Sequence, residues 1–451
     1  MAESKARGGL DSLAALREPA TIRLRCAAIT QAVTDSRSGW FRLDRSRLDN
    51  AADRVAKLTE QRFPDLRIPY HSRWRHFEAG GVDRKGELDA LLEGRSAAER
   101  ARAHFDLTVV SVLLDAGAGA AWHYRDGEAD YARSEGLGVA TFRAFIAGAF
   151  ANDPANPLRA DATALQKLDA AALRKMFQVS TGNPIVGLEG RAGLLARLGD
   201  ALQHEAGRDD VEARPGLLFD RLTAGGAGEV GAAQVLGEVL RAFAPIWRSG
   251  SVLRGVPAGD VWPHRFAGGE TAHGREAGTD GWVPFHKLSQ WLSYSLLEPL
   301  QWAGVRVTGL DALTGLPEYR NGGLLVDSGV IVPRSDRDLA KRWKPGDEII
   351  IEWRALTVTL LDELAVRVRE RLGKTAEELP LACILEGGTW AAGRQIATEL
   401  RPDGSPPSGA ATARRRWPST ATARCSKELE RGPWQASSTT SPTRWSSTSS
   451  R

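Results

Sequence analysis

The chain has 451 residues, of which 42% are hydrophobic and 26% are charged, and its formal net charge at pH 7 is only +4. These proportions supply a substantial hydrophobic core, in one large domain or two smaller ones, and they exclude a chain that is disordered throughout. Such a small net charge indicates no concentrated basic face, so nucleic acid is a disfavoured partner.

The N-terminal segment, residues 1–20, is polar and lacks an apolar signal core, and we expect it to be flexible. No run approaches the roughly 18 apolar residues that a membrane span requires, so we expect no integral membrane segment. Three scattered cysteines, Cys26, Cys383 and Cys425, argue against a disulfide framework and favour a reducing compartment. The expected location is therefore cytoplasmic.

Residues 21–407 are expected to form a single, mainly α-helical domain with a few short β-strands. Apolar residues recur with helical spacing at 194–202 and at 235–243. Strand-like apolar runs are short and occur at 323–332 and at 348–353. Strands are thus a minor part of the expected fold.

The densest run of functional side chains follows Pro284. On a helix that starts there, Lys287 and Gln290 are three residues apart and Tyr294 follows four later, so the three can share one face. His286 directly precedes them. The alternative is that the lysine and the glutamine are solvated surface residues.

Two units of an acid and an arginine come after this helix. Glu318-Tyr319-Arg320 lies in a loop bounded by Pro and Gly, from which a carboxylate can point into a cleft. Glu352 and Arg354 lie at the end of the second strand-like run, where alternation places both on one face. One such pair is usually a structural ion pair, but two of them near the lysine helix indicate a charged, desolvated pocket.

Other kinds of site have less support. The eight histidines include no His-Glu-x-x-His pair and the cysteines no Cys-x-x-Cys, so we expect no metal and no cofactor. Gly373-Lys374-Thr375 ends like a phosphate-binding loop, but Val368 stands where the first glycine belongs, which favours a helix end. No serine has glycines two residues away on both sides, so there is no nucleophile elbow.

The last segment, residues 408–451, changes abruptly in composition. Ser, Thr, Arg, Ala, Pro and Trp dominate it, whereas Leu, Ile and Val almost vanish. It cannot bury enough apolar surface to offset its ordering entropy. We expect either a disordered tail or, given the Ala, Gly and Arg bias upstream, GC-rich DNA translated in a shifted frame. We assign the tail no function.

Several long motifs occur in the same order as in a known family. They are IPYHSRWRHF at 68–77, Trp262-Pro263-His264, the run 284–327 and Glu386-Gly387-Gly388-Thr389-Trp390. By these motifs the chain resembles the uracil catabolism protein four family over about residues 20–407. The resemblance implies a role in pyrimidine degradation, a nucleoside-like or nucleotide-like substrate such as ribosylurea or its 5′-phosphate, and other pathway enzymes as candidate partners.

A weaker similarity concerns the queuosine-salvage N-glycosidases. Phe285-His286-Lys287 with Gln290, then Glu318-Tyr319-Arg320, then Glu352-x-Arg354 are spaced like the motifs of that family. The similarity implies a helical fold akin to that of DNA glycosylases. This chain has Glu318 where that family has Asp, and the extra methylene can shift the carboxylate by roughly an ångström.

Cleavage of a ribose C1′–N bond has requirements that these residues can meet. The sugar develops positive charge that Glu318 can stabilise, while the departing nitrogen needs a proton or a hydrogen-bond donor. Lys287 or Arg320 can take that second role or hold a 5′-phosphate, and Glu352 can orient Arg354. We therefore assign Glu318 and Lys287 as catalytic. The expected substrate-binding residues are Gln290, Tyr319, Arg320, Glu352, Arg354, His286 and Trp390, although core packing is the more common role of such aromatic side chains.

Two other functions stay open. A non-catalytic scaffold or ligand-binding protein of the same pathway would use the same pocket, and loss of turnover without loss of binding in Glu318→Gln would separate it from an enzyme. A DNA or RNA glycosylase would require strong, salt-dependent binding to oligonucleotides.

Overall fold

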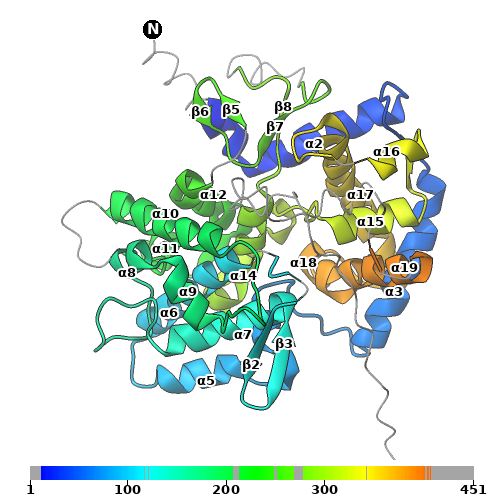
Figure 1. Cartoon of the computed structure of the whole chain (residues 1–451). Coiled ribbons are helices and arrows are strands. Elements are labelled where there is room, and N and C mark those ends of the chain that lie inside the picture. Colours follow the sequence, from blue (N-terminus) through cyan, green and yellow to red (C-terminus); the bar gives the residue numbers. More distant parts are fainter. Residues whose placement is uncertain are drawn as a thin grey trace, which may run out of the picture.

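Helices from the two ends of the sequence pack against one another, and helices from its middle form a second group (Figure 1). The computed structural model describes residues 12–115, 117–119, 121–206, 213–247, 251–268, 278–341, 343–401, 404–405 and 407. The expectation for the tail, 408–451, lies outside these residues. Helices dominate and every strand is short, so the mainly helical fold is confirmed. In the described part of the chain, no helix is both long and apolar enough to span a membrane.

The first group is built on α17 (Glu348–Leu372), which packs against α2 (Pro19–Thr34) and α3 (Leu48–Arg62). Its other members are α15 (Tyr319–Asp327), α16 (Asp336–Ala340), α18 (Leu381–Ile384), the π-helical turn η5 (Leu385–Thr389) and α19 (Trp390–Leu400). Helix α15 packs mainly against α19, and η5 packs against α3.

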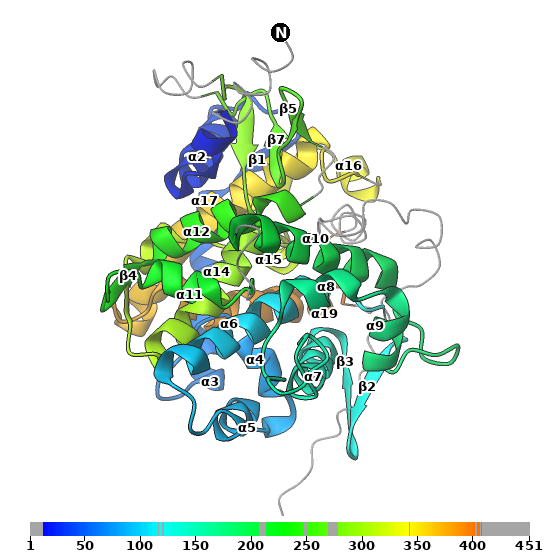
Figure 2. The same cartoon turned by 90° about the vertical axis from the view of Figure 1, so that its left-hand side faces the viewer.

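The second group surrounds α14 (Lys287–Trp302), which lies between α12 (Ala232–Phe243) and α6 (Ala97–Leu114) in both views (Figure 1 and Figure 2). The remaining helices of this group are α4 (Trp74–Phe77), α5 (Arg84–Leu91), α7 (Arg133–Ile146), α8 (Ala162–Lys167), α9 (Ala170–Met176), α10 (Leu188–Ala206) and α11 (Leu217–Leu222). Single 3-10 turns are η1 (Arg45–Arg47), η2 (Ala79–Gly81), η3 (Ala244–Ile246) and η4 (Leu310–Ala312).

The strands of the described residues form five two-stranded sheets. Four are antiparallel, and they pair β1 (Phe41–Leu43) with β10 (Ile331–Pro333), β2 (His123–Asp126) with β3 (Ala129–Ala132), β5 (Val252–Leu253) with β6 (Val256–Pro257), and β7 (Val261–Pro263) with β8 (Trp282–Pro284). The parallel pair is β4 (Glu229–Gly231) with β9 (Arg306–Thr308). Strand β8 leads the chain directly into α14.

The sequence pattern predicts some elements correctly and others wrongly. The helices expected at 194–202 and 235–243 are α10 and α12, and Gly373 ends α17 with a φ of 61°. The strand prediction at 348–353 is wrong, because these residues form the first turns of α17. Within 323–332 only the end is a strand, since 324–326 belong to α15. A helix buried on all sides shows no helical period, so its apolar run resembles a strand.

The first core residues lie earlier than expected. Residues 12–17 are helical, and Leu13 and Leu16 are fully buried in a small cluster with Leu253 and Val261. The two leucines are three residues apart, so a helix places them on one face. Part of the segment expected to be flexible is therefore packed against β5 and β7, while residues 1–11 lie outside the described residues.

Helix α14 is buried on almost every side although it contains three serines. The Ser293 hydroxyl donates to the carbonyl of Ser289, and the Ser295 hydroxyl donates to the carbonyl of Trp291, both at 2.8 Å. Because these two hydroxyls bond within their own helix, they are not left as unpaired donors in the core. The helix is thus a rigid base for the residues at its first turn.

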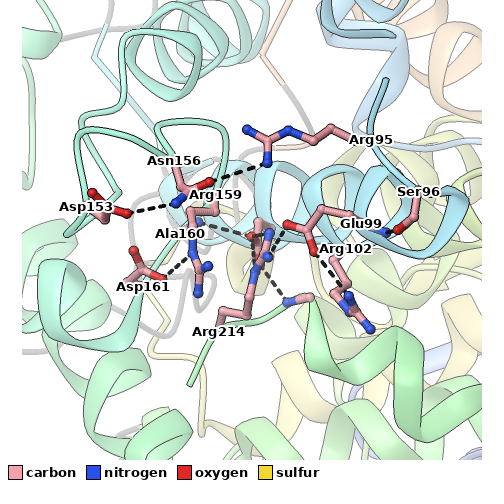
Figure 3. Close-up of polar contacts among 12 residues, drawn as sticks. Arg95, Ser96, Glu99, Arg102, Asp153, Asn156, Arg159, Ala160, Asp161 and Arg214 are labelled. Atoms are coloured by element: carbon pink, nitrogen blue, oxygen red, sulfur yellow. Dashed lines mark hydrogen bonds and ion pairs between the residues drawn. The ribbon is translucent and has the colours of Figure 1, made fainter. Parts of the chain in front are cut away.

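A buried ion pair fixes α6. The carboxylate of Asp106 accepts hydrogen bonds from Arg214 at 2.8 and 2.5 Å and from the backbone N–H groups of Ala160 at 3.1 Å and Gly216 at 2.6 Å. Arg214 also donates to Glu99 at 2.5 Å, from the same helix as Asp106 (Figure 3). The network compensates both buried charges, and it holds the helix that ends at Asp115.

Helices α15 and α19 approach most closely at Gly393. A Cβ atom at this position would overlap the backbone carbonyl oxygen of Arg320. We expect Gly393→Ala to destabilise the fold by about 1–3 kcal/mol, because a helix backbone must shift to make room. Urea unfolding monitored by circular dichroism measures the change.

Gly237→Ala is the matched control for that variant. Gly237 also lies within a helix, α12, but a Cβ atom there would meet no other atom within 4 Å. Because alanine has the higher helix propensity, we expect this variant to gain up to about 1 kcal/mol. Equal losses of stability in the two variants would contradict the close contact.

Candidate active site

Five segments of the chain meet at the start of α14. Lys287 is the first residue of α14, Glu318 precedes α15, and Asp115 follows α6. The charges of Glu318 and Asp115 both act on the Lys287 ammonium group, which places the three side chains in one site. The remaining two segments are 71–76, which include the start of α4, and η5. The His71 ring packs against Trp291, one turn into α14, and Glu386 of η5 binds His71.

Asp260 holds the first turn of α14. Its carboxylate accepts two hydrogen bonds from Arg354, at 2.8 and 2.7 Å, one from the indole of Trp262 at 2.7 Å and one from the backbone N–H of Lys287 at 3.0 Å. Burial alone would raise the pKa of Asp260, but the charge and hydrogen bonds of Arg354 outweigh it and hold the pKa well below its usual range. An ionised Asp260 therefore joins α17 to the start of α14.

His286 turns the chain from β8 into α14. Its backbone is left-handed, with φ of 47° and ψ of 38°, a region that residues other than glycine seldom adopt. The imidazole is buried, and its Nε2 lies 3.0 Å from the carbonyl oxygen of Leu16. Burial lowers the pKa of His286, so a neutral ring donates this bond. In this arrangement His286 positions Lys287.

Glu318 caps α15 from a buried position. Its two carboxylate oxygens accept hydrogen bonds from the backbone N–H groups of Arg320 at 2.8 Å and Asn321 at 2.5 Å. Burial raises the pKa of Glu318, although these two bonds and the charge of Lys287 act in the opposite direction. Each carboxylate oxygen has more than one acceptor direction, so the cap leaves Glu318 able to contact a ligand.

Lys287 is partly buried, and the described residues include no hydrogen-bond or ion-pair partner for its ammonium group. Burial lowers the pKa of Lys287, whereas the charges of Glu318 and Asp115 raise it. Burial thus moves both Lys287 and Glu318 toward their neutral forms, as is typical of catalytic groups. An ammonium group in this position can bind an anionic group or donate a hydrogen bond to a substrate.

Gln290 and Tyr294 share a face of α14, as the spacing predicts. The side-chain amide of Gln290 donates to the Thr314 hydroxyl at 3.1 Å and accepts from the Thr314 backbone N–H at 3.3 Å. The Tyr294 hydroxyl donates to the Thr314 carbonyl at 2.9 Å. Both side chains are fully buried, so a solvated position for Gln290 is wrong. These bonds fix the segment that leads to Glu318.

Tyr319, Arg320 and Trp390 form a cluster between α15 and α19. The guanidinium carbon of Arg320 lies 5.2 Å from the ring centre of Tyr319 and 6.0 Å from that of Trp390. The same guanidinium donates to the carbonyl of Gly404 at 3.0 Å. The charge of Arg320 still acts on Glu318, although its side chain is directed toward the C-terminal residues.

Glu352 and Arg354 have other partners than the sequence suggests. They lie on α17, where residues two apart do not share a face, so the strand argument for a common face is wrong. Arg354 takes Asp260 as its bidentate partner. Glu352 accepts from the Ser38 hydroxyl at 2.5 Å, and its other oxygen lies 3.6 Å from Nε2 of His264.

Six charged or titratable residues around the site do not appear among the predicted site residues. They are Asp260, Asp115, Arg73, His76, His71 and Glu386. The Arg73 guanidinium lies 3.1 Å from Asp115, and His71 lies 2.8 Å from Glu386. Four of them lie in the motifs at 68–77 and 386–390. The ionisable side chains of these two motifs could have indicated that both motifs contribute to the site. Within the described ranges, no group of three or more His, Cys, Asp or Glu residues is arranged to hold a metal ion.

The sequence matches a family model and two proteins over most of its length. The model described as "Protein of unknown function (DUF1688)" matches residues 15–411. "Protein urg3" of Schizosaccharomyces pombe is 39% identical over 404 residues, which cover 88% of this chain and 97% of that protein. "Uracil catabolism protein 4" of Lachancea kluyveri is 37% identical over 402 residues, which cover 82% of this chain and 90% of that protein. All the residues of the site lie within the range matched by the family model.

Proposed function

This chain belongs to the family described as a protein of unknown function (DUF1688), and from that membership we propose that it acts in pyrimidine catabolism. The name of the relative Uracil catabolism protein 4 supports this role, and it agrees with the resemblance that the motifs indicate. We further propose that the reaction is hydrolysis of an N-glycosidic bond in ribosylurea or its 5′-phosphate. The spacing shared with queuosine-salvage N-glycosidases supports this reaction, and it also implies a DNA-glycosylase-like arrangement of the helices.

The nearness of two buried groups of opposite charge, Lys287 and Glu318, is the observation that carries the proposal. A buried carboxylate stabilises positive charge on a substrate more strongly than an exposed one, because water screens it less. Lys287 lies near enough for its charge to act on Glu318, yet it has no partner among the described residues. Its ammonium group is therefore available to the substrate.

In the proposed reaction, Glu318 and Lys287 act on different parts of the substrate. As the C1′–N bond breaks, the ribose ring gains oxocarbenium character, and the Glu318 carboxylate stabilises that charge or aids the attack of water. Lys287 binds the 5′-phosphate or donates a hydrogen bond to the departing group. Asp260, His286 and Gln290 act through these two residues, because they fix the first turn of α14 and the segment before α15.

Release of urea tests the proposal directly. The purified protein is incubated with ribosylurea, ribosylurea 5′-phosphate or uridine, and free urea is measured with a coupled enzyme assay. We expect urea release from one or both ribosylureas. Hydrolysis of uridine would release uracil, which is measured by its absorbance, and we expect none. Tight binding of a ribosylurea without release would favour the scaffold or ligand-binding function instead.

The pH dependence of turnover is a further expected result. Glu318 acts in its ionised form, and burial raises its pKa, so activity should rise with pH through a value above the ordinary glutamate pKa of about 4.3. Initial rates measured across the acid range, with circular dichroism at each pH to show that the protein stays folded, give this value. An acid limb centred at or below the ordinary value would contradict an ionised, buried Glu318 as the reacting group.

We also propose a cytoplasmic location, with enzymes of the same pathway as partners. Cys26 and Cys383 are both buried and unpaired, which fits a reducing compartment. A fluorescent fusion in the native host would show the location, and co-purification with other enzymes of uracil breakdown would show the partners.

A further inference from the structure

His71 and Glu386 form a hydrogen-bonded pair at the edge of the site. Nδ1 of His71 lies 2.8 Å from a carboxylate oxygen of Glu386, and the His71 side chain is 18% exposed. A carboxylate that accepts from Nδ1–H fixes the tautomer, so Nε2 is the nitrogen that can exchange a proton with a ligand. Among the described residues, Nε2 has no hydrogen-bond partner.

The pair lies beside the catalytic residues of the proposed reaction. The His71 ring packs against Trp291, with ring centres 4.8 Å apart, and Trp291 is one helical turn after Lys287 on the same face of α14. On the other side, Thr389, which ends η5, donates to Asn321 at 2.9 Å, and the backbone of Asn321 binds Glu318. Both connections lead from the pair to the Lys287 and Glu318 site.

Glu386 is held rigidly by its surroundings. Its second carboxylate oxygen lies 3.2 Å from the guanidinium of Arg62, which also donates to the carbonyl of Gly387 at 2.9 Å. A Cβ atom at Gly388 would lie within 2.8 Å of Thr59 and Val55, so glycine allows the turn to approach α3. Glu386 also lies on a π-helical turn, a feature that is frequent at functional sites.

We propose that His71, oriented by Glu386, is a further catalytic residue and that it protonates the departing nitrogen. This assignment rests on the proposed N-glycosidic hydrolysis. Lys287 then binds the anionic part of the substrate. His71 acts as the acid that protonates the leaving group, and the Glu318 carboxylate stabilises the positive charge on the sugar.

The proposed step balances without a co-reactant other than water. As the C1′–N bond breaks, its electron pair leaves with the nitrogen, and the proton on Nε2 of His71 forms the new N–H bond of free urea. Water forms the C1′–O bond and loses one proton, which restores the imidazolium through solvent. One water is consumed, and ribose, or its phosphate, and urea are released.

Other groups near His71 fit this role less well. The pKa of His76 is lowered to about 4 by burial and by the charge of Arg73, so His76 is neutral at physiological pH. The charged groups next to His71 are Glu386, which binds its Nδ1, and Arg62, which pairs with Glu386, whereas Arg73 contacts His76. With a carboxylate on Nδ1 and a side chain that is partly exposed, His71 is the imidazole placed to donate.

His71→Asn tests the proposal. The asparagine amide can replace Nδ1 in the bond to Glu386 but has no counterpart of Nε2, so the packing contact survives and the acid is lost. We expect kcat for ribosylurea 5′-phosphate to fall by about 10²–10⁴-fold with little change in KM, and the alkaline limb of the pH profile to move or vanish. A ribose phosphate with 4-nitrophenol as leaving group needs no acid, so the variant should hydrolyse it at nearly the wild-type rate.

His104→Gln is the matched control. Like His71, His104 binds a carboxylate, with its Nε2 2.9 Å from Asp89, and it packs against the rings of Trp74 and Trp302. It lies eleven residues before Asp115 on α6, which places it roughly 16 Å from Asp115 along the helix. We expect its turnover and pH profile to match the wild type.

The outcomes separate this assignment from the proposed function. An unchanged rate and pH profile in folded His71→Asn would overturn the role of His71 while leaving N-glycosidic hydrolysis intact. An equal loss with the 4-nitrophenol substrate would show that His71 acts only through structure. No turnover of either substrate by the wild type would overturn the proposed function and this assignment together.

Discussion

Glu318→Gln is expected to reduce urea release by about a thousandfold while leaving substrate binding nearly intact. The amide keeps the size of the side chain but removes the negative charge that, in the proposed reaction, stabilises the sugar in the transition state. The buried position of Glu318 makes this loss large, since little water is present to screen or replace the charge. Single-turnover kinetics with ribosylurea 5′-phosphate, together with calorimetric binding of the same compound, separate the two effects.

The cap that Glu318 provides to α15 requires a control. Glutamine replaces one of the two accepting oxygens with a donor, so the helix loses a capping bond at a cost of about 1 kcal/mol. Asp169→Ala removes a capping carboxylate elsewhere, since Asp169 accepts from the backbone N–H of Ala172 at 2.8 Å. We expect this control to lose comparable stability and no activity. If both variants lost turnover in proportion to stability, Glu318 would be a structural cap only.

Asp260→Asn is expected to destabilise the protein by about 3–5 kcal/mol, because it leaves the fully buried Arg354 guanidinium without its charged partner. The same change weakens the bond to the backbone of Lys287, so activity should fall even in conditions where the variant remains folded. Urea unfolding gives the loss of stability, and urea release measured at low temperature gives the loss of activity.

Asp362→Asn provides the comparison for a surface position. Asp362 also forms a bidentate pair, with Arg23 at 2.8 and 3.1 Å, but the two side chains are 33% and 34% exposed. Solvent screening limits such a pair to about 0–1 kcal/mol. A similar loss of stability in the two variants would mean that burial does not set the strength of the Asp260 pair.

The Asp260 contribution also has a defined pH dependence. Its pKa in the folded protein lies below the unfolded value of about 3.9, so the stabilisation is fully present above that unfolded value and is lost as pH falls through the folded pKa. The difference in stability between the wild type and Asp260→Asn should therefore be constant near neutral pH and shrink only in strong acid.

Apolar spacing in the sequence predicts those helices that have one buried face and one exposed face. Helices α10 and α12 each have one buried face, so their apolar spacing predicts them correctly. The first turns of α17 are buried on every side, and no pattern of spacing distinguishes them from a strand. The same reason explains why the sequence pattern wrongly placed Glu352 and Arg354 on one face.

Contacts between distant residues account for the parts of the site that the sequence could not indicate. Asp260 and Arg354 are 94 residues apart, and His71 and Glu386 are 315 residues apart. Spacing along the chain predicts which side chains share one helix face, as it does for Gln290 and Tyr294, but it does not reveal which carboxylate a buried arginine binds.

The sequence by itself determined the family, the mainly helical class and the candidate pair Lys287 and Glu318, because these depend on ordered motifs and on residue types within short runs. Only the tertiary structure decided which groups support the pair: Asp260 at the first turn of α14, Thr314 below Gln290, and the His71 and Glu386 pair beside Trp291. These partners come together because helices from the two ends of the chain bury their apolar faces against one another, and that packing sets distances that no local pattern contains.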